Sequence, residues 1–525
     1  MARLLKRDEA ATLIRDGSTL LLTGSGGGLM DADFIYEAIE RRFLETGHPQ
    51  GLTIVHITGI GDGRGGGVDR FAHPGMVRRV IGGHWGWSPK MQQLALSEQI
   101  EAYNLPQGVL SLLTREIAAR RKGLFTRVGL MTFVDPRLQG GKLNRAAKED
   151  LVRLIELEGE ELLFYRSFPV DVAIVRGTTA DESGNISVEW EAANLDVLSA
   201  AQAARNSGGI VIAQVKRLAR RGTLNPRLVK IPAHLVDVVV VHPGQWQTCE
   251  AEYNPAFSGE IRVPPDILTP LDFGVRKLVA RRAALELKPG SLVNLGFGIA
   301  DGVADVAAEE GLCDRLTFTI EQGIIGGVPA KGAIFGAGWN PDAIIDAPSQ
   351  FDFYHGGGID IAFLGAAQVD ARGNVNVSKF GNTIAGCGGF IDISQTAKRV
   401  VFCCTFTTGG LRVRCEDQRL IIEKEGSVKK FVREVEHVTY SGEYARLHNQ
   451  PVLYVTERAV FELVEGHLRL VEIAPGVDLE SQVLSQMEFV PEISSDLRLM
   501  DPRIFAEGRM NLGWSEKVDP ELRHA

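Results

Sequence analysis

The sequence lacks the features of a membrane-embedded, disulfide-stabilised or nucleic-acid-binding protein. It has no apolar run of the ~18 residues that a transmembrane helix needs, and no apolar stretch of signal-peptide length follows Met1. Its six cysteines form neither C-x-x-C pairs nor a cluster with histidine, which argues against a zinc site and a disulfide framework. The 57 basic and 66 acidic residues give a net charge of −9, so no general attraction to nucleic acid or anionic membrane is expected. We therefore expect a cytoplasmic protein that has no metal site and binds neither nucleic acid nor membrane.

The composition is that of a globular protein with unusually many glycines. Of 525 residues, 44% are hydrophobic and 23% are charged, and the length suits two to four domains of about 100–200 residues. Glycine occurs 59 times, above the ~7% that is typical. The glycines are clustered, and several clusters follow apolar runs that are typical of buried strands.

The sequence contains an internal repeat. Residues 171–187 align without gaps on residues 360–376 at a constant offset of 189, so that Asn185 corresponds to Asn374. Each copy predicts a buried strand, a turn of the form Asp-x-x-Gly-Asn and a second strand.

Two further pairs of segments match in the same two halves. An apolar strand that runs into a glycine turn occurs at 16–28 and again at 289–298, and both turns lead into helical patterns. The strand at 52–59 is matched by the one at 316–323. Strands that alternate with helices predict an α/β fold: two repeated α/β domains with largely parallel sheets and a cleft between them.

Two prolines mark the expected boundary between the halves. Pro264 and Pro265 interrupt the periodic pattern, which predicts an N-terminal domain over 1–262 and a C-terminal domain over 263–525. The first half is longer by an insert at about 85–160. Close to the C-terminus, residues 478–487 predict a closing helix.

Glu321 is the residue that breaks the repeat. It occupies the position that Ile57 has in the first half, although the apolar strand before it and the glycine after it agree. The carboxyl end of a strand is where open α/β sheets bind ligands. Such a glutamate could be a general base, a nucleophile or a metal ligand, and it could also merely cap a turn or pair with an arginine. A metal ligand is the weakest of these, because no second carboxylate or histidine stands beside it at ligand spacing.

Three glycine-rich turns are candidates for anion or oxyanion binding. They lie at 24–28, 296–302 and 386–389, and the first two come where a predicted strand leads into a predicted helix. Backbone N–H groups at such turns can bind an anion, although a glycine turn can also be only a tight turn. The second turn has one residue too many for the dinucleotide-binding fingerprint.

The segment that begins at Glu321, Glu-Gln-Gly-Ile-Ile-Gly-Gly-Val-Pro-Ala, is the most specific motif. Together with Leu-Gly-Phe-Gly-Ile at 295–299, Gly-Asn-Val-Asn at 373–376 and Gly-Cys-Gly-Gly-Phe at 386–390, it resembles class I coenzyme A-transferases. The sequence is most similar to the single-chain acetate/propionate CoA-transferase branch and is also similar to succinyl-CoA:3-ketoacid CoA-transferases. The resemblance extends from about residue 5 to about residue 492.

The resemblance implies a ping-pong reaction on Glu321. Its carboxylate would attack a short-chain acyl-CoA, such as acetyl-CoA or propionyl-CoA, to give an acyl-glutamyl anhydride and then a glutamyl-CoA thioester. A second carboxylate would then react with this thioester by the same steps in reverse order. No cofactor beyond coenzyme A as substrate is implied. The partners would be acyl-CoA and short-chain carboxylates, and the family resemblance suggests a homo-oligomer, a tetramer.

The same resemblance implies roles for residues of the glycine turns and of the insert. The oxyanion and substrate-binding set would be Gly26, Gly27, Gln107, Asn374 and Gly388. The CoA-binding set would be Gly296, Gly298 and Gly386.

Three other functions remain open from the sequence. The same glutamate could hydrolyse acyl-CoA, which a dependence on an acceptor carboxylate would distinguish from transfer. The chain could also be a non-catalytic ligand-sensing module of related fold, since fold does not imply function. A nicotinamide-dependent enzyme is the weakest alternative, because the glycine motif does not fit.

Overall fold

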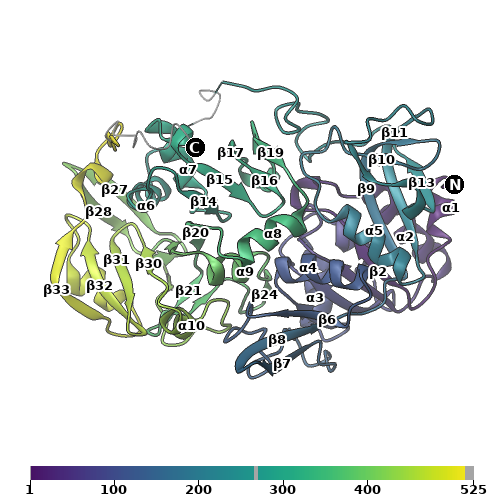
Figure 1. The fold of residues 1–525 in the computed structure, drawn as a ribbon. Helices are drawn as coiled ribbons and strands as arrows, with labels where there is room; N and C mark the ends of the chain where they lie inside the picture. Colours follow the sequence, from purple (N-terminus) through teal and green to yellow (C-terminus); the bar gives the residue numbers. More distant parts are fainter. Residues whose placement is uncertain (1, 265–269, 515–525) are drawn as a thin grey trace.

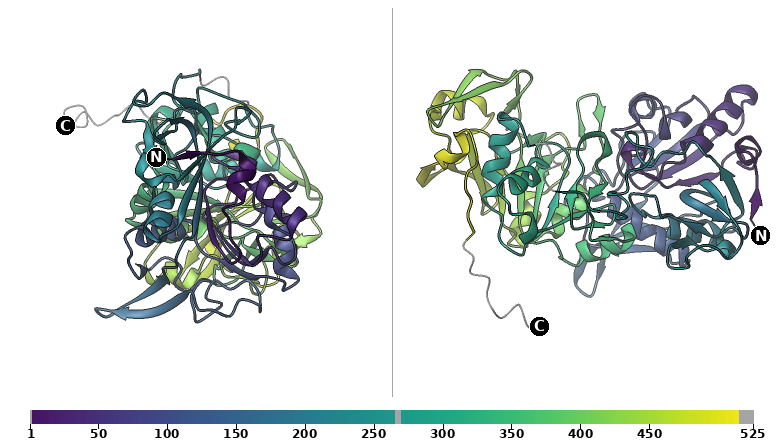
Figure 2. Two further views of the ribbon diagram at one scale, coloured as in Figure 1. Left: turned by 90° about the vertical axis from the view of Figure 1, so that its right-hand side faces the viewer. Right: turned by 90° about the horizontal axis from the view of Figure 1, so that it is seen from above.

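The computed structural model describes residues 2–264 and 270–514, and Pro265 and Asp266 of the predicted boundary lie outside that part. The chain forms two α/β units that lie side by side along the long axis of the molecule (Figures 1 and 2). Each unit is built around one large sheet.

The first sheet is parallel along its main path. Its strands follow the order β1 (Arg3–Leu4), β13 (Val238–Val241), β11 (Ile210–Ala219), β9 (Val172–Asp181), β2 (Thr19–Leu22), β3 (Leu52–His56), β4 (Val77–Gly82) and β5 (Glu101–Asn104). All seven neighbouring pairs along this path are parallel. The short strands β10 (Ile186–Ser187) and β12 (Val229–Ile231) add an antiparallel fringe.

The second sheet has a parallel centre with antiparallel strands on both sides. Its order is β19 (Ala343–Ile344), β16 (Ile324–Ile325), β15 (Thr317–Ile320), β14 (Leu292–Leu295), β20 (Ile361–Gly365), β25 (Val400–Cys403), β30 (Val452–Val455), β31 (Ala459–Val464), β32 (His467–Ile473) and β33 (Glu492–Leu499). Strands β15 to β30 are mutually parallel. The predicted α/β class with largely parallel sheets is confirmed.

The sequence repeat is also a repeat in strand order. The path β13-β11-β9-β2-β3 in the first sheet corresponds to β30-β25-β20-β14-β15 in the second. The aligned pairs β9 and β20, β2 and β14, and β3 and β15 therefore occupy equivalent places. Glu321 directly follows β15, as Ile57 directly follows β3, so both lie at the carboxyl end of a central parallel strand.

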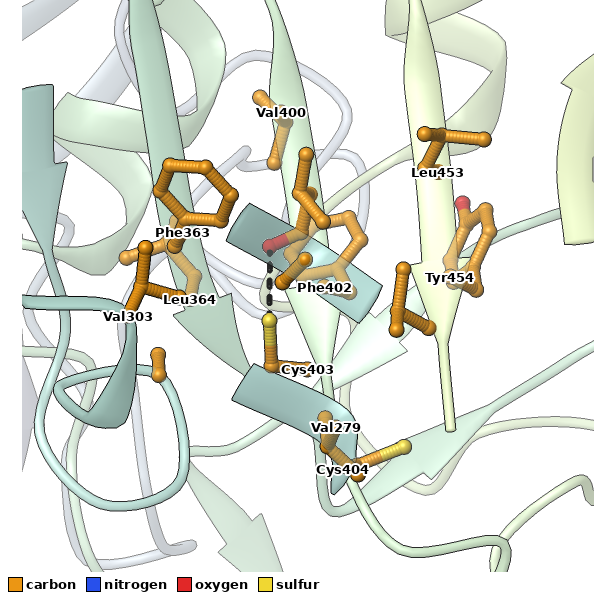
Figure 3. Close-up of a cluster of buried hydrophobic side chains, with 14 of the residues drawn as sticks. Val279, Val303, Phe363, Leu364, Val400, Phe402, Cys403, Cys404, Leu453 and Tyr454 are labelled. Atoms are coloured by element: carbon orange, nitrogen blue, oxygen red, sulfur yellow. Dashed lines mark hydrogen bonds between the residues drawn. The ribbon is translucent and has the colours of Figure 1, made fainter. Parts of the chain in front are cut away.

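The parallel strands are buried on both faces, which explains their continuous apolar sequences. In β2, Leu20 and Leu22 pack with helix α2 (Asp33–Thr46), whereas Leu21 packs on the opposite face with α5 (Val197–Asn206). This alternation follows from the two-residue period of a strand. The second sheet has the same kind of core, and Figure 3 shows Phe402 of β25 and Tyr454 of β30 within it.

The helices lie close to the predicted positions. The helical patterns after the first two glycine turns form α2 (Asp33–Thr46) and α7 (Gly302–Glu309). The other helices are α1 (Arg7–Ala11), α3 (Pro89–Leu96), α4 (Gln107–Ala118), α6 (Val275–Ala284), α8 (Ala347–His355), α9 (Phe390–Thr396), α10 (Gly442–Leu447) and α11 (Leu479–Gln482). Within the described residues, no helix is long and apolar enough to cross a bilayer.

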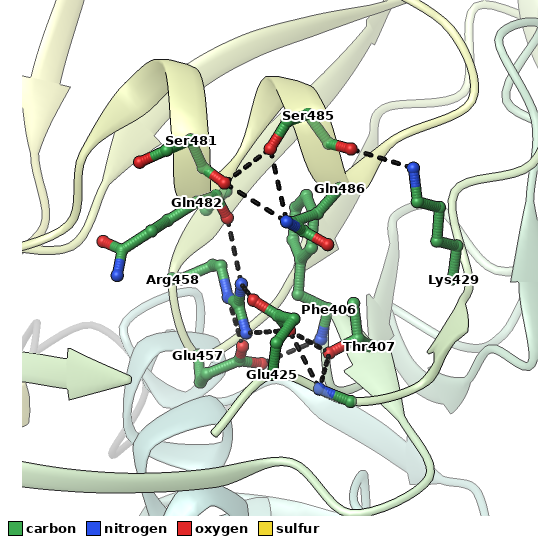
Figure 4. A network of polar contacts seen from close by, with 12 residues as sticks. Phe406, Thr407, Glu425, Lys429, Glu457, Arg458, Ser481, Gln482, Ser485 and Gln486 are labelled. Atoms are coloured by element: carbon green, nitrogen blue, oxygen red, sulfur yellow. Dashed lines mark hydrogen bonds and ion pairs between the residues drawn. The ribbon is translucent and has the colours of Figure 1, made fainter. Parts of the chain in front are cut away.

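The prediction of a closing helix at 478–487 is wrong in extent. Only α11 and a short 3₁₀ turn over Leu484–Gln486 form there, and β33 then pairs in parallel with β32. Tertiary contacts determine the conformation of residues 478–487. The main-chain oxygen of Gln482 accepts a hydrogen bond of 2.9 Å from the guanidinium of Arg458, which is fully buried and also paired with Glu457 and Glu425 (Figure 4).

The insert of the first half supplies an edge strand of the parallel sheet and elements that contact the second unit. It supplies α3, β5, α4 and a separate antiparallel sheet of β6 (Gly123–Thr126), β8 (Glu160–Arg166) and β7 (Val152–Leu157). Helix α4 lies next to α8 and α9 of the second unit (Figure 1). The insert thus brings first-half residues against the second half at the site described next.

Candidate active site

A cavity of about 480 Å³ lies between the two units and has Glu321 in its wall. Both halves line it. The first half contributes Ser25, Gly26, Thr58, Gly59, His84, Gly86, Trp87 and Gln107. The second half contributes Gly296, Phe297, Glu321, Gln322, Phe335, Leu364, Gly365, Val377, Ala385 to Phe390 and Ile393.

Glu321 is a buried carboxyl group. Its side chain is only 8% exposed, and the nearest donor, Nε2 of Gln322, is 3.5 Å from Oε1, at the outer limit of a hydrogen bond. The pKa of Glu321 is raised to about 7, chiefly by burial and to a smaller extent by the charge of Asp392, and the hydrogen bonds to the carboxylate only partly offset this rise. The carboxylate is therefore poorly solvated and half ionised near neutral pH, which suits a nucleophile or a general base.

The turn at 24–28 places Gly26 at the cavity, but it places Gly27 elsewhere. A Cβ at Gly26 would lie 2.3 Å from Nε1 of Trp87, so only glycine fits beside this wall of the cavity. Gly27 has a positive φ of 76°, and a Cβ there would lie 2.1 Å from the main-chain oxygen of Ala333 in the second half. Gly26 can therefore present its N–H to a substrate, whereas Gly27 packs the two halves together.

Gln107 reaches the cavity from the first residue of α4. Its side chain is 3% exposed, and its Nε2 has no hydrogen-bond partner among the described residues. Its main-chain N–H donates to the oxygen of Gly388 over 2.8 Å, which ties the start of α4 to the second half. A buried amide donor without a partner at a cavity wall is suited to bind a carboxylate or carbonyl oxygen.

The cluster at 386–389 also reaches the cavity, but most of its N–H groups are already used. Gly386 donates to the oxygen of Ser378, Cys387 to Oδ1 of Asn104 and Gly388 to the oxygen of Gly83. A Cβ at Gly386 would lie 2.9 Å from the main-chain nitrogen of Trp85, so glycine allows the two halves to approach closely here. The N–H groups of Cys387 and Gly388 join the two halves, that of Gly386 bonds within the second half, and none of the three is free for an oxyanion.

Gly389 is the residue of this cluster that sequence reasoning missed. A Cβ on Gly389 would lie 3.5 Å from Cγ of Glu321, so its backbone lies directly against the Glu321 side chain. Its N–H donates to no acceptor within the described residues. The run of glycines at 386–389 was the only signal in the sequence, and it did not indicate which glycine faces Glu321.

Asn374 is not among the residues that line the cavity. Its Nδ2 donates to Asp370 over 2.9 Å and its Oδ1 accepts from the N–H of Gly442. The repeat partner Asn185 has the same arrangement, with Asp181 as acceptor and the N–H of Ala233 as donor. The asparagine in the Asp-x-x-Gly-Asn turn thus holds its own turn in both halves, and the expected oxyanion contact of Asn374 is not supported by its position.

Of the two glycines predicted to bind CoA in the 296–302 turn, one lines the cavity. Gly296 does so beside Phe297, which is 58% exposed and whose ring lies 5.7 Å from the ring of Phe335. Gly298 does not line the cavity, and its main-chain oxygen accepts from Arg276. The exposed ring of Phe297 indicates where the cavity opens.

His84 forms part of the wall as a neutral imidazole. Burial lowers its pKa to about 4. Its Nδ1 accepts the N–H of Gly86 over 3.2 Å, so the ring proton resides on Nε2. In the described ranges 2–264 and 270–514, no group of three His, Cys, Asp or Glu side chains could hold a metal ion, and all six cysteines are free.

Comparison with known proteins gives consistent matches over the whole chain. Residues 5–242 match the family model described as Coenzyme A transferase. The chain is 45% identical to the acetate CoA-transferase YdiF of Escherichia coli strain K12 over 522 residues, covering 99% of this chain and 97% of that protein. It is 49% identical to the caffeate CoA-transferase of Acetobacterium woodii over 519 residues, covering 97% and 98%. Its structure matches a crystal structure of YdiF from E. coli O157:H7 as a thioester complex with CoA, with a TM-score of 0.93, 45% identity and 98% of each chain covered.

Proposed function

The chain belongs to the coenzyme A transferase family and is a CoA-transferase, and on this premise we propose that Glu321 carries the transferred CoA between a short-chain acyl-CoA and a carboxylate. One observation carries this proposal. Among the described residues, Glu321 supplies the only carboxyl group in the wall of the inter-unit cavity. Its side chain is buried against Gly389 of the second half, and Nε2 of Gln107 from the first half, which has no partner in the described part of the chain, lies in the same wall.

In the first half-reaction the carboxylate of Glu321 attacks the thioester carbonyl carbon. The carbon–sulfur bond breaks, CoA leaves as a thiolate, and the acyl group stays on Glu321 as a mixed anhydride. The thiolate then attacks the carbonyl carbon of Glu321. The carbon–oxygen bond breaks, the carboxylate product leaves with one oxygen of Glu321, and a glutamyl-CoA thioester remains. An incoming carboxylate reverses these steps.

The backbone around Glu321 suits the two tetrahedral intermediates of this reaction. We propose that the N–H of Gly26, which lines the cavity, stabilises the oxyanion on the acyl carbonyl. The N–H of Gly389, whose backbone lies against Glu321, would stabilise the oxyanion on the glutamyl carbonyl. The Nε2 donor of Gln107 would orient the carboxylate substrate. We propose Phe297 and Phe335 as the side along which the CoA arm enters, with Gly296 beside it.

The apolar part of the wall supports transfer over hydrolysis. Leu364, Val377, Phe390 and Ile393 supply side chains in the wall that offer water no hydrogen bond. A glutamyl-CoA thioester in such a site is hydrolysed slowly, because little water reaches its carbonyl carbon. The proposal includes the division into units 1–262 and 263–525, acetate or propionate as acceptors, and a homo-oligomer.

The test is the intact mass of the protein after incubation with acetyl-CoA, followed by peptide mapping. We expect a CoA-sized adduct on Glu321 that disappears when acetate or propionate is added, and no adduct on Glu321→Gln. Steady release of CoA without an acceptor would indicate a hydrolase. The absence of both adduct and CoA release, with the acyl donor and the acceptor varied, would indicate a ligand-binding module.

A further inference from the structure

A second cavity, of about 540 Å³, lies behind the glycine turn that borders the first. Gly26 lines the first cavity, and Gly28, two residues on, lines the second. The second cavity is formed by the start of α2, by β11 and by the loop that follows β13. None of the groups assigned to CoA transfer lines it, so its polar wall has no role in the mechanism above.

The basic side chains that line this cavity are already paired. Arg7 pairs with Glu37 and lies over the ring of Phe34, and Arg176 pairs with Glu191 over 3.0 Å. Asp33 is likewise paired with an arginine, Arg70, over 2.7 Å. The cavity wall therefore has no unpaired cation within the described residues that would attract an anion.

Two buried acceptors of the wall have no partner. Oδ1 of Asp31 and Oε1 of Gln214 accept no hydrogen bond from the described residues, although the two side chains are only 9% and 2% exposed. The amide NH₂ of Gln214 is used, because it donates to Gln245 over 2.9 Å. Arg176 donates to the main-chain oxygen of Asp31 and not to its carboxylate. Buried polar groups are normally paired, and both orphan groups here lack a donor.

The aromatic part of the wall suits the same kind of ligand. Trp246 is 51% exposed and lines the cavity, whereas the ring of Phe34 is covered by Arg7 and by the stacked ring of His242. Burial, and to a smaller extent the neighbouring Asp33, raise the pKa of Asp31. A bound cation would compensate the charge of an ionised Asp31, and the indole face of Trp246 would attract the same cation.

We propose that this second cavity binds a small organic cation with N–H donors, a primary ammonium or guanidinium group, held by Asp31 and Gln214 and covered by Trp246. The site is linked to the glycine turn of the active site. The N–H of Cys249, in the cavity wall, donates to the main-chain oxygen of Gly27 over 2.6 Å. A ligand in the second cavity therefore acts on the turn that presents Gly26. A change in the rate of CoA transfer on ligand binding would rest on the proposed function, whereas the binding itself does not.

Cys249 provides a readout of binding that does not depend on activity. Its thiol is exposed and lies in the cavity wall, so an occupying ligand shields it from alkylation. The probe is benzylammonium, with benzyl alcohol as the neutral control and benzyltrimethylammonium as a cation without N–H donors. The rate of iodoacetamide alkylation at Cys249 is followed by peptide mapping on the full-length protein at pH 8.

We expect benzylammonium to slow alkylation several-fold, benzyl alcohol to have no effect and benzyltrimethylammonium to protect more weakly. In Asp31→Asn and in Gln214→Leu the concentration needed for half-protection rises by roughly tenfold or more, because the first variant removes the negative charge that attracts the cation and the second removes the amide oxygen that accepts its hydrogen bond. Each variant is compared with its own ligand-free rate. Because Asp31→Asn and Gln214→Leu test the same site independently, the result of one is sufficient if the other does not fold.

Two further variants serve as controls. Glu252→Gln removes an acid from the same loop whose side chain pairs with Lys216 and does not line the cavity, and we expect it to keep full protection. Glu321→Gln also keeps protection, because the probe does not occupy the active site. The proposal is overturned if benzylammonium does not protect the wild-type thiol, if benzyl alcohol protects equally, if neither Asp31→Asn nor Gln214→Leu weakens protection, or if protection requires Glu321.

Discussion

At the scale of the residue, the environment of Glu321 sets the pH range in which it can react. An acid whose pKa is raised to about 7 is mostly protonated, and so not nucleophilic, at pH 6. We predict that the rate of the first half-reaction with acetyl-CoA rises about tenfold per pH unit below pH 7 and levels off above it. Single-turnover release of CoA across pH 5.5–8.5 measures this. A midpoint near the ordinary glutamate value of ~4.3 would contradict the assignment.

The same burial predicts an unusual effect on stability. Because the folded-state pKa of Glu321 lies above the unfolded value, the folded protein binds the extra proton between about pH 4.5 and 7, and stability falls as pH rises through that window. Glu321→Gln, which cannot ionise, should therefore be more stable than wild type at pH 8, by up to about 3 kcal/mol, and similar at pH 4.5. Unfolding by urea at both pH values measures the difference.

A second buried glutamate provides the control for this prediction. Glu457 is also buried, but it is paired with Arg458 over 2.7 Å. Glu457→Gln removes a compensating charge from a buried arginine and should destabilise the protein at pH 8 by several kcal/mol. If Glu457→Gln were more stable than wild type, or if Glu321→Gln gained no stability between pH 4.5 and pH 8, burial would not account for the stability effects of these two carboxyl groups.

At the scale of the element, the start of α4 depends on the other half of the chain. The residue before the helix is Pro106, which has no side-chain acceptor, and the acceptor comes instead from Asp392 of α9. Its carboxylate accepts the N–H groups of Gly108 and Val109 over 3.0 and 3.1 Å and pairs with His355. Asp392 is thus a positioning residue for Gln107, the first residue of the same helix.

We predict that Asp392→Asn lowers stability by about 1–2 kcal/mol, the usual scale for a lost helix cap, and raises KM for the acceptor carboxylate more than KM for acyl-CoA. The reason is that Gln107 is proposed to orient the carboxylate. Steady-state kinetics with each substrate varied would measure the two KM values. The control is Asp352→Asn, which removes an exposed ion pair with Arg115 on the same α4 and should change neither KM. Equal changes in both KM values for Asp392→Asn would exclude the positioning role.

At the scale of the whole molecule, the cavity exists only where the two units meet. Main-chain hydrogen bonds join them directly, including those from Trp85 to Ala385, from Gln107 to Gly388 and from Gly388 to Gly83. Substrate that contacts both sides of this junction should stabilise both units together.

We predict that Glu321→Gln, which cannot form the covalent adduct, unfolds in one calorimetric transition and that this transition shifts upward with CoA. At a CoA concentration of 100 times Kd the stabilisation should be about 2.7 kcal/mol. Two separate transitions, of which only one moves with CoA, would show that the units unfold independently and that CoA contacts only one of them. Adenosine, which lacks the pantetheine arm, serves as the control ligand and should shift the transition less.

The sequence by itself determined the α/β class, the repeat and the position of Glu321. These follow from local patterns: apolar runs predict buried strands, glycine clusters predict turns, and a carboxylate that replaces Ile57 is visible in a single alignment of the two halves. The family motif around Glu321 is also a local pattern.

Only the tertiary structure decided which residues surround that glutamate. Gly26, Gln107 and Gly389 lie far apart in the chain and line one cavity because the two units pack against each other, and no local pattern encodes such packing. For the same reason the sequence alone did not show that the side chain of Asn374 bonds within its own turn. Its turn looks functional in sequence, but its hydrogen bonds close the turn, as those of Asn185 do. Whether the backbone N–H of a glycine can bind a substrate depends on whether it already donates to an acceptor in the protein, and the fold decides which acceptors lie within reach.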